Sequence, residues 1–421
     1  MSDTKRFNPF RPYTPAPPGM FTGRIHELNR IDDAFIKLCN NNPSNLMIVG
    51  ERGIGKSSLL LFANYLARGD VTWMQSDKYN FLPIQFSIDK SLNTLNIIKK
   101  IQRFLERHLG KEEIALSILK KSWDFIKKIE IASSRINSEE QITDPNELFD
   151  KFVYSLIDTV KMISDDSFIT EKGIRTRKDG VIFLIDEADN ASPDLDLGTF
   201  LKTLSEALVI ENCNNVMFLI TGLPKTRKIL YDSHPSSLRL FEELELLPLQ
   251  PEDVGSIYLK GMDAINKNVE DKKYSISNEA LKQMINVSEG YPHFAQQIGF
   301  TTFDLNTDIE ISKETTFKAI FGKNGAIDLI GDRYYRDMYF EQIKEDSYRE
   351  ILQIMSETED PLSIISRKAL RSKFSKSDQI LDNGLKALKD RNIILPVQGK
   401  RGWYKFQWIG FGVWIKFFSR K

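Results

Sequence analysis

The sequence has few of the residues that build metal sites and disulfide frameworks. In 421 residues there are only two cysteines and four histidines. Cys39 and Cys213 stand in no Cys-x-x-Cys pair, so zinc is not expected, and both cysteines are expected to be reduced. No stretch reaches the ~18 consecutive apolar residues that a membrane span needs, and the polar N-terminus has no apolar signal core. We therefore expect a cytoplasmic protein with no membrane partner.

A net charge is also missing, but the charges are unevenly distributed. Lys and Arg together number 58, as do Asp and Glu, which gives a formal net charge of zero. From Pro361 to Lys421, however, Lys and Arg far outnumber Asp and Glu, so the rest of the chain is acidic by the same amount. The length is typical of about two to three domains. The pattern predicts one basic module attached to an acidic body.

One stretch organises the rest of the chain. Residues 50–57 read Gly-Glu-Arg-Gly-Ile-Gly-Lys-Ser and fit G-x-x-x-x-G-K-[ST], with an apolar strand pattern before them and a helical pattern after them. Glycines let the backbone approach a polyphosphate, and the N–H groups of the loop and helix face its negative charge. Lys56 can then reach the β- and γ-phosphates, and the Ser57 hydroxyl can bind Mg²⁺. The predicted nucleotide contacts are Gly50, Glu51, Arg52, Gly53, Ile54, Gly55, Lys56, Ser57 and Ser58.

A second apolar strand pattern ends in Asp186-Glu187. Asp186 would hold Mg²⁺ together with Ser57, and Glu187 would orient and deprotonate the water that attacks the γ-phosphate. The next two residues complete the letters of the DEAD-box helicases, but the loop opening differs and their arginine-rich motif is absent. No Asn-Lys-x-Asp guanine motif occurs either. The predicted cofactors are therefore ATP and Mg²⁺.

Strand and helix patterns alternate through the first 250 residues. This alternation predicts an α/β protein of the P-loop NTPase class, with a parallel five-stranded sheet and helices on both faces. A long helical insertion is expected at about 92–175, and its polar stretch Ser133–Thr143 is predicted to be a mobile loop. The strands are predicted at 45–49, 82–88, 181–187, 215–222 and 244–247.

Other modules flank this core. The proline-rich residues 1–20 form an extended arm, either a free tail or a strap against the nucleotide site. The core is predicted to span 21–250, and a helical lid with three helices to span 251–328. Residues 329–421 are predicted to form a winged helix-turn-helix, with three helices followed by a β-hairpin.

These motifs together resemble the AAA+/STAND group of P-loop ATPases, in particular the archaeal-type ATPases and the related origin-recognition initiator ATPases. The resemblance covers most of residues 8–300. It runs through Asn8-Pro9-Phe10, residues 20–24 with Glu27-Leu28, the phosphate loop, residues 181–187, residues 219–222, Leu238-Arg239 and Gly290-Tyr291-Pro292.

The resemblance also implies roles for residues outside the phosphate loop and the Asp186-Glu187 pair. The box that contains Phe21, Gly23 and Arg24 would pack beside the adenine. Thr221, at the end of the strand between the phosphate-loop strand and the Asp-Glu strand, would be the polar sensor of the γ-phosphate.

A cation and a lid motif complete the implied site. Arg239 would be an arginine finger that acts on a neighbouring subunit's nucleotide, with Arg227 as a weaker candidate. Tyr291 and Pro292 match the Gly-x-Pro signature of STAND lids, which contacts the base and ribose, whereas initiator ATPases place an arginine sensor near this point. The adjacent His293 could touch nucleotide or have a structural role, and we favour the structural role.

The basic module carries cations at two places that suit DNA phosphates. Lys386, Lys389 and Arg391 belong to the third predicted helix, and Lys400 and Arg401 to the wing tip. The alternative is a protein-contact surface, which many winged helices of this superfamily provide.

Two functional hypotheses follow. In the first, the protein is an ATP-dependent molecular switch: Mg-ATP binding and hydrolysis gate lid and winged-helix docking, self-assembly, and engagement of DNA or an effector protein. Relatives of this kind act in replication, transposition or defence. In the alternative, it is a nucleotide-gated DNA-binding regulator in which hydrolysis is slow or dispensable.

Overall fold

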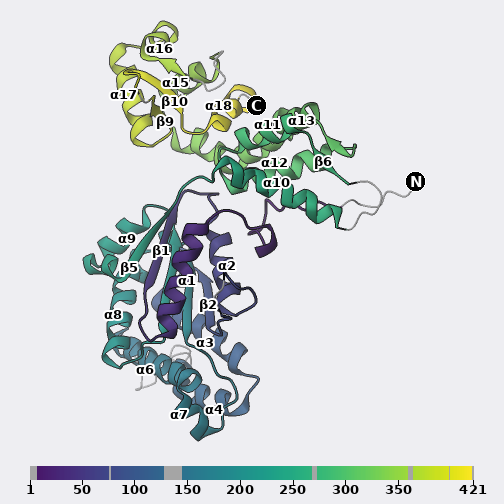
Figure 1. The fold of residues 1–421 in the computed structure, drawn as a ribbon. Coiled ribbons are helices and arrows are strands. Elements are labelled where there is room, and N and C mark those ends of the chain that lie inside the picture. Colours follow the sequence, from purple (N-terminus) through teal and green to yellow (C-terminus); the bar gives the residue numbers. More distant parts are fainter. Residues whose placement is uncertain are drawn as a thin grey trace. The chain divides into compact units, whose positions relative to one another are not determined.

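The computed structural model describes residues 7–74, 77–127, 145–267, 273–358, 364–397 and 399–419. The chain forms two compact units (Figure 1). The sheet unit consists of Pro17–Gly19 and Arg24–Leu247, and the helical unit of Met1–Ala16, Met20–Gly23 and Pro248–Lys421. No helix in the described ranges is both long enough and apolar enough to span a bilayer.

Five parallel strands form the sheet unit, in the order β2-β3-β4-β1-β5 (Figure 1). This confirms the predicted α/β class with a parallel five-stranded sheet. The order places the C-terminal ends of β1, β4 and β3 side by side, at the edge where ligands bind in such sheets. The strands are β1 (Asn45–Gly50), β2 (Leu82–Ser87), β3 (Val181–Asp186), β4 (Val216–Gly222) and β5 (Phe241–Leu246).

Helices pack on the sheet because alternate strand residues point to opposite faces. On one face, residues such as Val49, Phe183 and Phe218 join a buried cluster with α3 (Thr94–Leu109), α6 (Pro145–Ser164) and α8 (Leu197–Ile210). Two further helices, α1 (Ile25–Cys39) and α2 (Lys56–Ala67), contact the strands but contribute nothing to that cluster. They therefore cover the opposite face.

The insertion between β2 and β3 contains α3, α4 (Glu113–Ser122), α6 and α7 (Asp166–Lys172). The polar stretch Ser133–Thr143, predicted to be a loop, lies outside the described residues.

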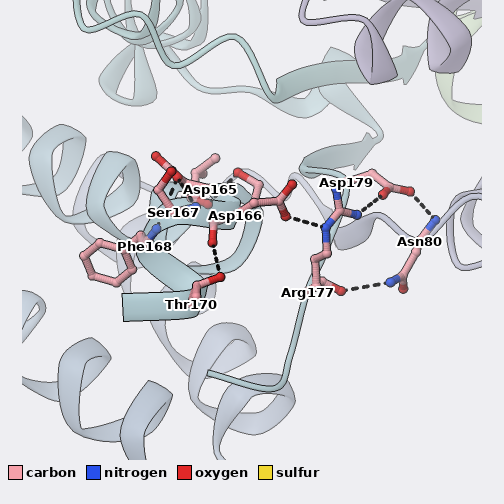
Figure 2. Close-up of polar contacts among 10 residues, drawn as sticks. Asn80, Asp165, Asp166, Ser167, Phe168, Thr170, Arg177 and Asp179 are labelled. Carbon is pink, nitrogen blue, oxygen red and sulfur yellow. Dashed lines mark hydrogen bonds and ion pairs between the residues drawn. The ribbon is translucent and has the colours of Figure 1, made fainter. Parts of the chain in front are cut away.

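A polar network fixes the return of this insertion to the sheet (Figure 2). Asp165 caps α7 by accepting hydrogen bonds from two backbone N–H groups. Arg177 binds Asp166 at 2.7 Å and Asp179 at 3.2 Å. Asn80, just before β2, donates its side-chain amide to the Arg177 carbonyl and its backbone N–H to the Asp179 carboxylate. The starts of β2 and β3 are thereby held together.

The lid portion of the helical unit has one helix more than the sequence predicts, and a small strand pair. β6 (Ser275–Ile276) and β7 (Glu310–Ile311) pair in parallel, but two residues are too few to show a strand periodicity. The helices are α10 (Pro251–Asn266), α11 (Asn278–Ser288), α12 (Pro292–Leu305) and α13 (Lys313–Phe321), followed by α14 (Ala326–Tyr334).

The C-terminal part is a winged helix, as predicted. β10 (Trp403–Phe406) pairs antiparallel with β9 (Ile394–Pro396) to form the wing, and also with β8 (Ile365–Ser366), a two-residue strand that the sequence pattern missed. The helices are α15 (Asp346–Ser356), α16 (Arg367–Lys373), α17 (Asp378–Asp390) and α18 (Ile409–Phe418).

Between Asn8 and Tyr13 the N-terminal arm packs against the lid helices. Phe10 is 2% exposed and its ring lies against Gly261 of α10 and Gly299 of α12. A Cβ at either glycine would come within 2.6 Å of the ring, so only glycine leaves room for it. Asn8 donates to the Asp304 carboxylate at 2.7 Å. The free-tail alternative is therefore wrong for this part of the arm.

Candidate nucleotide-binding site

The phosphate loop connects β1 to α2 and is shaped by its glycines. Gly53 and Gly55 adopt φ of +81° and +104°, values that residues with a Cβ rarely adopt. Lys56 starts α2, and its Nζ donates to the carbonyls of Gly50 at 2.9 Å and Glu51 at 2.8 Å. Burial lowers the pKa of Lys56, and nearby carboxylates, Asp186 first, oppose that shift. The ammonium thus lies inside the loop, where phosphate oxygens could replace the two carbonyls as its partners.

Asp186, at the end of β3, is the centre of the site. It is 9% exposed, and its Oδ2 accepts a hydrogen bond from Ser57 Oγ at 2.7 Å. Its Oδ1 accepts from the fully buried Thr221 hydroxyl at the end of β4 and from the Glu187 N–H. Donors from the first turn of α2, from the end of β4 and from the residue after β3 therefore meet on one carboxylate.

The oxygens of Ser57 and Asp186 suit Mg²⁺. A hydroxyl and a carboxylate are hard ligands, and Mg²⁺ typically takes one or two protein oxygens and completes its shell with water and phosphate. Bound with ATP, the ion would neutralise charge that develops on the phosphates. Ser57 and Asp186 are already within hydrogen-bond distance, so they could share one ion without rearrangement of the strands.

Glu187 has surroundings unlike those of its neighbour. It is exposed, has a left-handed φ of +56°, and caps the short helix η2 (Ala188–Asn190). The Asn190 amide donates to Glu187 Oε2 at 3.3 Å and to the Ile88 carbonyl at 3.4 Å. The pair thus offers one carboxylate bound by three donors and one accessible to water.

Asp189 is a positioning residue that sequence reasoning overlooked. It is 9% exposed, its Oδ1 accepts from the Leu223 N–H at 3.1 Å, and its Oδ2 lies 3.3 Å from Lys225 Nζ. These bonds hold the chain directly after Thr221. No local pattern could reveal them, because they join residues 34 positions apart.

Arg24 supports the phosphate loop from behind. Its side chain is 7% exposed, and its guanidinium donates to the Ile54 carbonyl at 2.9 Å and to Glu27 at 3.1 Å. The neighbouring Phe21 and Gly23 belong to the helical unit, where Lys260 donates to the Phe21 carbonyl at 2.6 Å. Adenine contact by this box stays a prediction.

The two candidate arginine fingers differ in how they are held. Arg239 is exposed at the end of η4 (Pro235–Leu240), immediately before β5, and forms no ion pair with any residue in the described ranges. Arg227, on α9 (Thr226–Ser233), is bound to Glu243, with Nε 2.6 Å from Oε2, and lies 3.5 Å from Glu245. The parallel register of β5 with β1 puts Arg239 at the end of the strand opposite its own phosphate loop. Arg239 is thus free to reach outward, and Arg227 is engaged within its own chain.

The lid motif forms the turn before α12. Tyr291 is 6% exposed and caps the helix, and Pro292 is its first residue. Burial, helped by Arg333, lowers the pKa of His293 to about 4, so this imidazole is neutral near pH 7. Its ring packs on Tyr334 with centroids 5.2 Å apart, which suits the structural role that we favour.

The predicted DNA contacts all lie on the winged helix. Lys386, Arg391, Lys400 and Arg401 are exposed, and Lys389 is half-buried. Arg391 donates to the Gln342 carbonyl at 3.1 Å, and Lys400 Nζ lies 5.1 Å from the Trp403 ring centroid.

The structure adds cations that the prediction omitted. Arg367 forms a two-pronged pair with Asp382, and Arg371 binds Asp378, so α16 neutralises the acidic start of α17. Three further lysines are exposed nearby: Lys368 and Lys373 on α16, and Lys376 in the turn between the two helices.

Comparison with solved structures defines the fold. The ORC2 protein of Aeropyrum pernix, in ADPNP–ADP complexes, superposes with a TM-score of 0.59 at 13% identity, over 97% of this chain and 96% of that one. The Walker-type ATPase of Pyrococcus abyssi gives 0.52 at 14% identity, over 94% and 96%. This chain has the fold of the archaeal ORC and Walker-type ATPases. Both comparisons rest on shape, because the identities are low.

Sequence comparison is less informative. No protein-family model matches the chain. An uncharacterised HTH-type transcriptional regulator of Methanocaldococcus jannaschii is 27% identical over 191 residues, which is 42% of this chain and 47% of that protein. The chain thus matches about half the length of this relative.

Proposed function

We propose that the protein is an ATP-dependent molecular switch. Mg-ATP binding and hydrolysis would gate the docking of the lid and winged helix, self-assembly, and engagement of DNA or an effector protein. Lys56 would bind the phosphates, Ser57 and Asp186 would hold Mg²⁺, Glu187 would activate water, and Thr221 would sense the γ-phosphate.

One observation carries this proposal: Ser57, Thr221 and the Glu187 N–H all converge on Asp186, beside the phosphate loop. A metal ligand, a sensor and a carboxylate base accessible to water are what hydrolysis of a bound nucleotide requires. The ADPNP and ADP complexes of the Aeropyrum protein, which has the same fold, support nucleotide binding at such a site.

Two substitutions test the enzymatic part. Lys56→Ala should abolish ATP binding, measured by calorimetry. Glu187→Gln should leave binding within a few-fold and lower turnover by about 10²–10⁴-fold, the usual contribution of a general base. Glu113→Gln is a matched control, because Glu113 is exposed on α4. ATP binding by Lys56→Ala at the wild-type affinity would contradict the assignment.

A regulator that only binds nucleotide is the second candidate, and the winged helix favours it. The Methanocaldococcus protein that is similar over 191 residues is named as a transcriptional regulator of the HTH type, which agrees with a regulatory role. The same variants separate the two: if Glu187→Gln keeps the output that Lys56→Ala loses, binding alone suffices.

The DNA part needs a separate test. Turnover and molecular mass would be measured with and without duplex DNA. Lys386→Glu combined with Lys389→Glu should weaken DNA binding roughly tenfold and lower the salt slope by about 2, because each lysine neutralises one phosphate. Lys313→Glu, an exposed lysine of the lid, is the control. A monomer indifferent to DNA would point to a protein partner instead.

A further inference from the structure

Glu289 is a buried carboxylate with no part in the nucleotide-binding residues described above. It follows α11 in a left-handed conformation, φ +51°. Its Oε2 accepts from the Ile409 N–H at 3.0 Å, and its Oε1 from the Gly410 N–H at 3.0 Å. These groups open α18, which has no capping side chain of its own. A residue 120 positions earlier therefore caps the last helix.

The residues beside Glu289 contact the same helix. The Tyr291 ring meets Trp408, the residue before α18, edge-on with centroids 6.4 Å apart. Farther along α18, Trp414 packs against α14 so closely that a Cβ at Gly331 would overlap it. The turn before α12 and the first turn of α18 are thus joined by hydrogen bonds and by ring contact, while Trp414 anchors the helix independently.

We propose that Glu289 is a latch that couples the Gly290-Tyr291-Pro292 turn to the winged helix. The proposal rests on the proposed function, in which this turn responds to nucleotide. A rotation about the turn, where Glu289 and Gly290 both have positive φ, must carry the carboxylate with it. A buried carboxylate that lost both donors would be left without a partner or would have to take up a proton, so a movement of α18 that keeps the two hydrogen bonds is favoured.

The surroundings make the latch sensitive to charge. Burial raises the pKa of Glu289 to about 7, while the two N–H groups and Lys405 of β10 oppose this shift. Tyr335, just after α14, also faces the carboxylate, and its own pKa is raised by burial and by Glu289. Protonation of Glu289, or its replacement by a neutral residue, would therefore weaken the two hydrogen bonds that join it to α18.

Amide hydrogen exchange of the full chain, with and without ATP and Mg²⁺, tests the latch. In wild type, nucleotide should change exchange at residues 409–411 as well as protect the phosphate loop. In Glu289→Ala, residues 409–411 should exchange about ten- to a hundredfold faster without nucleotide, the loss expected for bonds to a charged group. In this variant, nucleotide should no longer change the exchange at residues 409–411, but it should still protect the amides of the phosphate loop.

Two variants make the test robust. Glu289→Gln keeps the shape and one acceptor oxygen, so it should show the same loss in smaller degree even if Glu289→Ala does not fold. Glu279→Ala, an exposed glutamate of α11, should behave as wild type.

The outcomes are distinguishable. If nucleotide slows amide exchange in the phosphate loop of the wild type but changes nothing at residues 409–411, the latch is refuted and the proposed function stays intact. A wild-type response in the Glu289 variants would refute it as well. Absence of loop protection in wild type would refute the proposed function, and the latch with it.

Discussion

The nucleotide site of the sheet unit and the Glu289 junction of the helical unit both centre on a buried carboxylate held by donors from elsewhere in the chain. At the first, Asp186 is bound by two hydroxyls and its neighbour's N–H, and these hydroxyls lie at positions that a motif or a strand end identifies. At the second, the hydrogen-bond donors to Glu289 among the described residues are two backbone N–H groups of a distant helix. A motif and a strand end predict the hydroxyl donors to Asp186, whereas no motif in the sequence predicts the two backbone donors to Glu289.

The same contrast applies to packing. The sheet is covered by helices whose apolar stripes are visible in the sequence, and its five strands appear as apolar runs. The helical unit depends in addition on single long-range contacts, such as Phe10 in its glycine-lined slot and Trp414 against Gly331. Substitutions at these two contacts should therefore affect stability more than chemistry, because neither contact belongs to the nucleotide site.

Outside the phosphate loop and the Asp186-Glu187 pair, the largest effect is expected at Arg239. If it acts on a neighbouring subunit, Arg239→Ala should lower ATP turnover by about 10³-fold, the scale of an arginine finger, without loss of ATP binding. Arg227→Ala should change turnover little, because Arg227 is already paired with Glu243.

Mixing subunits tests the role in trans. Arg239→Ala subunits retain an intact phosphate loop, and Lys56→Ala subunits retain the finger. Their mixture should regain turnover that neither has alone. A mixture that stays inactive while wild type assembles would argue against a finger at Arg239.

Phe10 tests whether the arm belongs to the helical unit. Phe10→Ala should lower the free energy of unfolding by about 4 kcal/mol, the usual cost of emptying a buried aromatic site, with turnover nearly unchanged. Phe7→Ala is the matched control, because Phe7 is 58% exposed. Urea unfolding monitored by circular dichroism gives both values, and equal losses for the two variants would show that the slot contributes nothing.

A smaller effect concerns pH. The Glu289 carboxyl has an ordinary pKa of 4.5, raised to about 7 in the folded protein, so the native state binds this proton more tightly than the unfolded state. Stability from this group is therefore greatest below pH 4.5 and falls as pH rises toward 7, by at most about 3 kcal/mol. Glu289→Gln should flatten this part of the curve of thermal midpoint against pH. An unchanged curve would show that Glu289 does not titrate there.

The sequence by itself determined the fold class of the sheet unit. The phosphate loop, Asp186-Glu187 and the alternation of strands and helices predicted the fold class, which the structure and the comparisons confirm. It also predicted the winged helix, because its three helices and hairpin have clear periodicities. Such features are local, and local patterns of burial and turn residues are visible in one sequence.

Only the tertiary structure decided which distant residues share a site. Three contacts join residues that are far apart in sequence. Asp189 binds the backbone after Thr221, Asn8 of the arm binds a lid helix, and Glu289 binds the start of α18. The helices α13 and α14 and the two-residue strands β6, β7 and β8 also escaped prediction. The strands are too short for a pattern and exist only through their partners. Backbone groups are the same in every residue, so no sequence pattern records which of them a buried carboxylate will bind.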